Sequence, residues 1–143
     1  MRRVASQSPC GGRSGAGALQ SSVNYRDGVG TPTFGEPPAG QIQYTADGRM
    51  GAFLMDPAWA ARGEVEANSF TDFFSYGGRW EMSGDQVMHF IEYASIPTKV
   101  GTDFVRTVTV IDADTIELTT APETSKSGAV YVTKLVWRRR AAL

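Results

Sequence analysis

Cysteine and histidine are almost missing from this chain. The 143 residues include one cysteine, Cys10, and one histidine, His89. A single cysteine cannot form an intramolecular disulfide, and the two side chains are too few for a zinc site of the common histidine and cysteine type. Only an all-carboxylate site for a harder cation stays open. We expect no metal and no cofactor, and the cysteine usage fits a reducing, cytoplasmic setting best.

The chain also lacks long apolar runs, an excess of charge and any familiar catalytic motif. No window approaches the roughly 18 consecutive apolar residues of a membrane-spanning helix. The formal net charge of −1 gives no basic field that would attract nucleic acid. A phosphate-binding Walker loop, HExxH, CxxC and GxSxG are all absent. We therefore expect a soluble protein with no nucleic-acid or membrane partner, whose function depends on residues that folding brings together.

What the chain does have is a succession of short β-type segments separated by turn signals. Asp27-Gly28 and Asp47-Gly48 suit tight turns with positive φ angles, and residues 78–139 alternate between β-type runs and polar connections. Consecutive strands with short connections favour a meander, and a meander of about eight strands hides its edges by closing. We predict one all-β domain over residues 18–140, an antiparallel up-and-down β-barrel.

One helical insertion interrupts this pattern, around residues 57–76. Asp56-Pro57 supplies a helix N-cap and a first helical residue, and residues 69–78 resemble a capping box followed by one or two helical turns. The strand before the insertion, residues 50–55, is apolar on both faces, which predicts that both faces are covered.

The first 17 residues differ from the rest in composition. They contain three arginines, no acidic residue and several glycines and serines. They lack the apolar core of a secretory signal, and we expect a disordered or divergent tail rather than a targeting segment.

Three ionisable residues on two neighbouring strands are the candidates for catalysis. Alternation places Glu92 with Met88 and Phe90 on the more apolar face of one strand, and Arg106 on an apolar face of the next. The loop between the strands brings Glu92 near Arg106, which predicts a charged pair inside the barrel. Such a pair anchors the polar group of a ligand, or it is a structural ion pair near the rim, or Arg106 caps the barrel end.

His89 lies on the opposite face from Glu92 in this assignment, where a β-bulge could turn it inward. A lone histidine in a strand is more often a packing residue than a base. Its ordinary pKa lies near neutrality, so a role in binding or proton transfer is the competing interpretation.

Aromatic side chains supply the candidates for the walls of a ligand site. They are core residues in the first place, and a barrel of eight strands is either packed solid or holds one small ligand. The candidates are Tyr44, Phe53, Tyr76, Trp80, Phe90, Tyr93 and Trp137.

Taken together, the ordered pieces FGEPPAG, YTADGRM, AFLMDP, YGGRWE, SIPTKVGT, FVRTV, LTT and LVWRR make residues 18–140 resemble a family of lipocalin-like barrel proteins. The resemblance implies a calycin-type barrel that binds a small, largely apolar molecule. The family pattern opens on a tryptophan that packs against a late arginine, here Arg138, but this chain has Gly17 at that position. The closure of that barrel end is therefore open at this point.

Two functions follow as hypotheses, with a purely structural or oligomer-forming domain as the third. The first is binding of a small hydrophobic metabolite inside the barrel. The second is a cofactor-free cyclase, isomerase or dehydratase that acts on a polyketide-like or terpenoid intermediate of secondary metabolism. In the second, His89 or Glu92 carries a proton, Arg106 stabilises negative charge and a tyrosine donates a hydrogen bond. A homodimer is compatible with either.

Overall fold

The computed structural model describes residues 15–63 and 69–140. These residues form one antiparallel sheet, the short helix α1 (Pro57–Arg62) and the 3₁₀ turn η2 (Pro97–Lys99). The strands of the sheet are β1 (Gly15–Arg26), β2 (Val29–Pro32), β3 (Ala39–Tyr44), β4 (Arg49–Met55), β5 (Phe73–Ser83), β6 (Gln86–Ala94), β7 (Asp103–Asp112), β8 (Thr115–Thr120), β9 (Glu123–Thr124) and β10 (Val130–Arg139).

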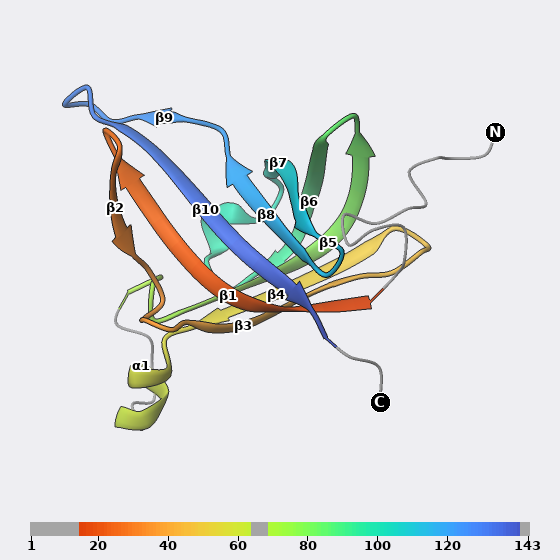
Figure 1. Ribbon diagram of the computed structural model, residues 1–143, viewed down its shortest axis with the longest axis horizontal. Helices are drawn as coiled ribbons and strands as arrows, with labels where there is room; N and C mark the ends of the chain where they lie inside the picture. Colours follow the sequence, from red (N-terminus) through yellow and green to blue (C-terminus); the bar gives the residue numbers. More distant parts are fainter. Residues whose placement is uncertain (1–14, 64–68, 141–143) are drawn as a thin grey trace.

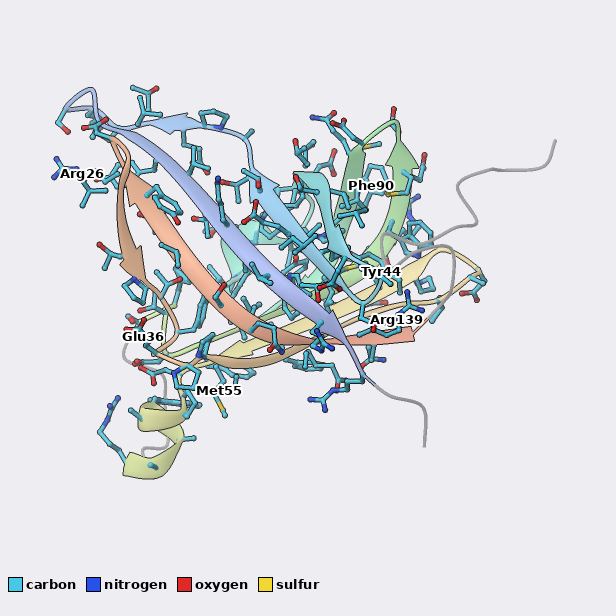
Figure 2. The ribbon with its side chains drawn as sticks, in the orientation of Figure 1. Arg26, Glu36, Tyr44, Met55, Phe90 and Arg139 are labelled. Atoms are coloured by element: carbon cyan, nitrogen blue, oxygen red, sulfur yellow. The ribbon has the colours of Figure 1, made fainter. Side chains whose placement is uncertain are left out.

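The sheet closes on itself because its first long strand pairs with its last. β1 runs antiparallel to β10 from Gly17 opposite Arg139 to Arg26 opposite Tyr131. Eight strands, β1, β3 to β8 and β10, complete the ring, and β2 and β9 extend β1 and β10 beyond it. Arg26 and Arg139 mark the two ends of this closing pair (Figure 2). The predicted up-and-down barrel of about eight strands is confirmed.

The two ends of the barrel have different connections. The tight turns β3–β4, β5–β6 and β7–β8 lie at one end, with the start of β1 and the end of β10, and we name it the turn end. The longer connections lie at the other end, the loop end, which also carries α1 and the β1–β2 turn (Figure 1). The Asp27-Gly28 turn and the Asp47-Gly48 turn occur where the sequence predicts them, with Gly28 and Gly48 at positive φ.

Several of the most deeply buried core side chains lie toward the turn end. Ile42, Tyr44, Trp80, Val87 and Leu118 face the interior there and are almost fully buried. Gly17 lies at the same end, and a Cβ added to it would lie 3.4 Å from Ile42 Cγ2 and from Trp137 Cβ. Trp137 and Ile42 thus occupy the space beside Gly17, so this end is closed without a tryptophan at that position.

The helical insertion is shorter than the sequence predicts. α1 has the predicted start, since the Asp56 side chain accepts a hydrogen bond from the Ala58 amide and Pro57 follows it, but it ends at Arg62, and Gly63 is its C-cap. The second predicted helical segment is wrong: Ser69 and Asp72 form a turn, and β5 begins at Phe73. Alternation explains the difference, because Phe74 and Tyr76 face the interior while Phe73 and Ser75 pair with β4 on the outer face.

β4 corrects a second expectation. Its inner residues Met50, Ala52 and Leu54 are buried, but Phe53 on the outer face is 47% exposed. The strand is therefore covered on one face only.

β1 begins at Gly15, before the expected domain start at residue 18, and residues 1–14 of the expected tail lie outside the described residues. None of the described helices is both long and apolar enough to cross a membrane.

Candidate functional site

His89 lies at the middle of the barrel interior, between two tyrosines. β6 buries Val87, His89 and Ile91, so the odd-numbered residues of this segment face inward. The His89 Nε2 atom lies 2.6 Å from the Tyr44 hydroxyl, and its Nδ1 atom lies 2.9 Å from the Tyr76 hydroxyl. Both ring nitrogens therefore have hydrogen-bond partners in a side chain that is 0% exposed.

The His89 imidazole is neutral at physiological pH. Burial, the larger cause, and the nearby positive charge of Arg106 together lower the pKa of His89 to about 3. A neutral imidazole donates from one nitrogen and accepts at the other, so one tyrosine hydroxyl donates to His89 and the other accepts from it. Burial also raises the pKa of Tyr76, against a smaller lowering by Arg106, so this hydroxyl keeps its proton.

Tyr44 connects His89 to the turn end of the barrel. Its ring packs edge-on against Trp80, with ring centroids 5.5 Å apart. The Trp80 Nε1–H in turn donates to the Thr45 carbonyl oxygen at 2.9 Å, in the β3–β4 turn. The hydrogen bond holds Trp80 in place, and the contact with the Trp80 ring restricts Tyr44. The Tyr44 hydroxyl then orients the ring of His89.

Arg106 shares the interior with His89 but has no acidic partner among the described side chains. It lies opposite Val87 on β6 and Thr120 on β8, both of which face inward. Its Nη1 donates to the Val105 carbonyl oxygen at 3.2 Å, and its guanidinium carbon lies 4.6 Å from the Phe104 ring centroid. The side chain is half-buried.

Polar side chains continue from Arg106 across the neighbouring strands. Thr120 of β8 lies opposite Arg106, and its Oγ1 accepts a hydrogen bond from the Thr133 amide of β10 at 2.9 Å. The Thr133 Oγ1 accepts from Asn24 Nδ2 of β1, also at 2.9 Å. Arg106, Thr120, Thr133 and Asn24 thus form a continuous band over four adjacent strands, which we name the polar band.

An aromatic wall adjoins the polar band at β7, where Phe104 contacts Arg106. Tyr76 contacts Phe104 edge-on with centroids 5.0 Å apart, and Phe74 lies 5.3 Å from Tyr76. Phe70 and Phe34, from the loops at the loop end, extend this series with centroid separations of 5.7 Å. The aromatic wall therefore runs from the loop end down to His89.

Glu92 lies on the outer surface, and the predicted Glu92–Arg106 pair is wrong. Its two carboxylate oxygens contact Arg49 at 2.6 Å and Arg79 at 3.4 Å. These contacts, with the Arg49 hydrogen bond as the largest cause, lower the pKa of Glu92. Its face follows from the register: His89, not Phe90, lies opposite Phe104, so the even residues Met88 and Phe90 point outward.

The aromatic candidates divide between the two faces of the barrel. Tyr44, Tyr76, Trp80 and Trp137 face the interior, and the last two are 2% exposed. Phe90 packs under Arg79 on the outer face, with the guanidinium carbon 4.8 Å from the ring centroid. The remaining two candidates, Phe53 and Tyr93, border an open outer depression of about 410 Å³ that is lined by Gly51, Phe53, Ser75, Tyr76, Gly77, Tyr93, Ala94 and Ser95.

Sequence reasoning missed Thr120, Thr133 and Asn24. A signal for the two threonines was present, because Thr120 follows Ile116 and Leu118 on the inner face and Thr133 precedes Leu135 and Trp137 there. No comparable signal marked Asn24, since the irregular pairing between Leu19 and Ser21 shifts the face of the residues that follow. No group of three or more metal-ligating side chains occurs in residues 15–63 and 69–140.

Comparisons with known proteins show a matching family model and similar solved structures, which include two engineered β-barrels. A family model described as a lipocalin-like domain matches residues 19–140. A de novo designed fluorescence-activating β-barrel has a TM-score of 0.46 at 15% identity, over 98% of this chain and 100% of that one. A redesigned β-barrel has a TM-score of 0.43 at 12% identity, over 89% and 90%. No curated protein matches the chain.

Proposed function

Because the chain belongs to the lipocalin-like domain family, whose barrel fold is consistent with small-molecule binding, we propose that it binds a small, largely hydrophobic metabolite inside the barrel. The site is the loop-end half of the interior. The aromatic wall contacts the apolar body of the metabolite, and the polar band contacts its polar group.

One observation carries this proposal. Along β8 and β10, the inward-facing residues toward the loop end remain partly exposed, although their neighbours further along the same strands are buried. Leu118 of β8 is 2% exposed, whereas its direct cross-strand partner Leu135 and the next inward residues Thr120 and Thr133 are half-buried. Side chains that face inward and still contact solvent border space that a ligand can fill.

The proposal is tested by native mass spectrometry of the purified protein and by titration with Nile red, a neutral probe whose fluorescence reports an apolar environment. We expect a retained small molecule and saturable Nile red binding. Leu135→Phe narrows the interior and should weaken Nile red binding at least several-fold. Val136→Phe places the same ring on the outer face of the same strand and should leave binding unchanged. An equal effect of both variants would place the probe outside the barrel.

A second function is favoured by the Tyr44–His89–Tyr76 series. A cofactor-free cyclase, isomerase or dehydratase needs a shaped, dry cavity and a positioned proton donor. When His89 donates from Nδ1 to the Tyr76 oxygen, the Tyr76 hydroxyl can direct its own hydrogen toward a ligand oxygen, and Arg106 stabilises the negative charge that develops there.

The two functions differ in the effect of Tyr76→Phe. If the retained molecule is extracted, added back and converted, loss of the hydroxyl should stop its conversion and leave its binding largely intact. If the molecule is recovered chemically unchanged from the wild-type protein, the barrel is a binding protein, and Tyr76→Phe changes affinity only.

A further inference from the structure

The barrel interior carries a positive charge that no acidic side chain of residues 15–63 and 69–140 balances. In the eight barrel strands, the residues that face inward include no aspartate and no glutamate. Glu81 and Glu92 of the β5–β6 hairpin and Glu117 of β8 lie on the outer face, and Asp103 lies opposite the outward Phe90. Arg106 is therefore the cation of the mid-barrel interior, beside a neutral His89.

A half-buried guanidinium requires compensation. One hydrogen bond to the Val105 carbonyl oxygen and one contact with the Phe104 ring leave most of its five N–H donors to other partners. An arginine in such surroundings gains most from a carboxylate, because both groups are planar and their hydrogen bonds are charge-assisted.

The rest of the polar band presents donors as well. The Thr120 oxygen already accepts the Thr133 amide, and the Thr133 oxygen already accepts the Asn24 side-chain amide. A hydroxyl that accepts one hydrogen bond still has its own hydrogen to donate. Both threonine hydroxyls can therefore donate to a group beside Arg106, so the band is suited to an acceptor rather than to another donor.

We infer that the ligand of this barrel is an organic acid with an apolar aromatic body, whose carboxylate binds to Arg106, Thr120 and Thr133. Its body lies against Phe74, Tyr76 and Phe104 of the aromatic wall. This inference rests on the proposed function and adds the chemical class of the ligand.

The test compares two probes of equal shape, 2-naphthoate and the neutral 2-naphthamide, by isothermal titration calorimetry at pH 7. We expect the wild-type protein to bind the acid about tenfold more tightly or better, the range that a charge-assisted hydrogen bond provides. Arg106→Gln should remove this preference, because it lowers the affinity for the acid far more than the affinity for the amide. Thr120→Val, which keeps the shape of the side chain, should reduce the preference several-fold.

Arg79→Gln is the matched control. Arg79 also lies over a phenylalanine ring and carries the same charge, but it lies on the outer face, so its loss should leave the preference for the acid unchanged. If Arg106→Gln does not fold, the inference is decided by the acid and amide affinities of the wild-type protein and of Thr120→Val.

The outcomes separate this inference from the proposed function. Equal binding of acid and amide, or a preference that persists without Arg106 or Thr120, overturns the inference and leaves the proposed function standing. Binding of Nile red without binding of either naphthalene probe also overturns the inference and leaves the proposed function standing. If neither Nile red nor a naphthalene probe binds, both are wrong.

Discussion

His89 illustrates how a single residue in this interior depends on its surroundings. Its two hydrogen bonds to Tyr44 and Tyr76 compensate both ring nitrogens in the neutral state, and a protonated ring would have to donate from both while buried. The neutral ring therefore joins two hydroxyls in a fixed arrangement, and a lower pH destabilises the folded protein through this residue.

The first prediction is a pH dependence of stability between pH 6.5 and pH 5. The folded pKa of His89 is about 3, below the ordinary value of 6.5, so below pH 6.5 the unfolded chain takes up a proton that the folded protein does not. The stability that His89 contributes is complete above pH 6.5 and is lost as the pH falls. The free energy of unfolding should decrease by up to about 1.4 kcal/mol per pH unit.

Urea denaturation at several pH values measures this slope. His89→Gln should flatten it, and a variant with the wild-type slope would assign the dependence to other groups. The window stops at pH 5 because carboxylates whose pKa is lowered, such as Glu92 and Asp112, lose their own contributions below it.

The second prediction concerns Glu92, whose location on the outer surface corrects the sequence-based pair. Its contacts with Arg49 and Arg79 lie in solvent, where ion pairs contribute little. Glu92→Gln should leave both the urea midpoint and Nile red binding within experimental error of wild type. A loss of probe binding in this variant would contradict the placement of the site inside the barrel.

At the scale of the elements, the β5–β6 hairpin depends on one glycine. The register shifts between Gly77 and Gly78, and Glu92 is the extra residue on the facing strand. A Cβ at Gly78 would lie 1.9 Å from the Phe90 carbonyl oxygen, a distance that the backbone of β6 cannot tolerate. The bulge therefore requires glycine at this position.

The third prediction compares two glycines of neighbouring strands. Gly78→Ala should lower the free energy of unfolding by about 3 kcal/mol or more, because the hairpin backbone must move. Gly51→Ala is the control, since a Cβ there has no atom within 4 Å. Chemical denaturation of both variants is the measurement. Equal stabilities would show that β6 accommodates the added methyl group.

The same hairpin shows why part of the site could not be predicted. The turn signals and the alternation of β3, β4 and β10 were sufficient to predict the barrel. β6 is apolar on both faces, and its pairing with β7 depends on the path of the chain through η2. Alternation alone thus predicts His89 on the outer face and Glu92 as the partner of Arg106. A change of register by one residue reverses such assignments.

At the scale of the whole molecule, burial of the inward side chains of β8 and β10 decreases from the turn end toward the loop end. Leu118 and Leu135 lie directly opposite each other on β8 and β10, yet only Leu118 is fully buried. The fourth prediction follows: Leu118→Ala should cost about 2–5 kcal/mol of unfolding free energy, and Leu135→Ala should cost less. Equal losses, measured by urea denaturation, would mean that the interior is packed throughout.

The pairing of β1 with β10 has a consequence for the synthesis of the protein. Gly17 lies beside Arg139, so nearly the whole chain must leave the ribosome before this pair can form. At about 5–20 residues per second, β1 has to wait for seconds with one edge unpaired. Such an edge can pair with a strand of another nascent chain. A nascent chain on a neighbouring ribosome of the same messenger RNA can therefore pair with β1 before β10 does. Slower translation before residue 130 would favour this intermolecular pairing over closure of the barrel.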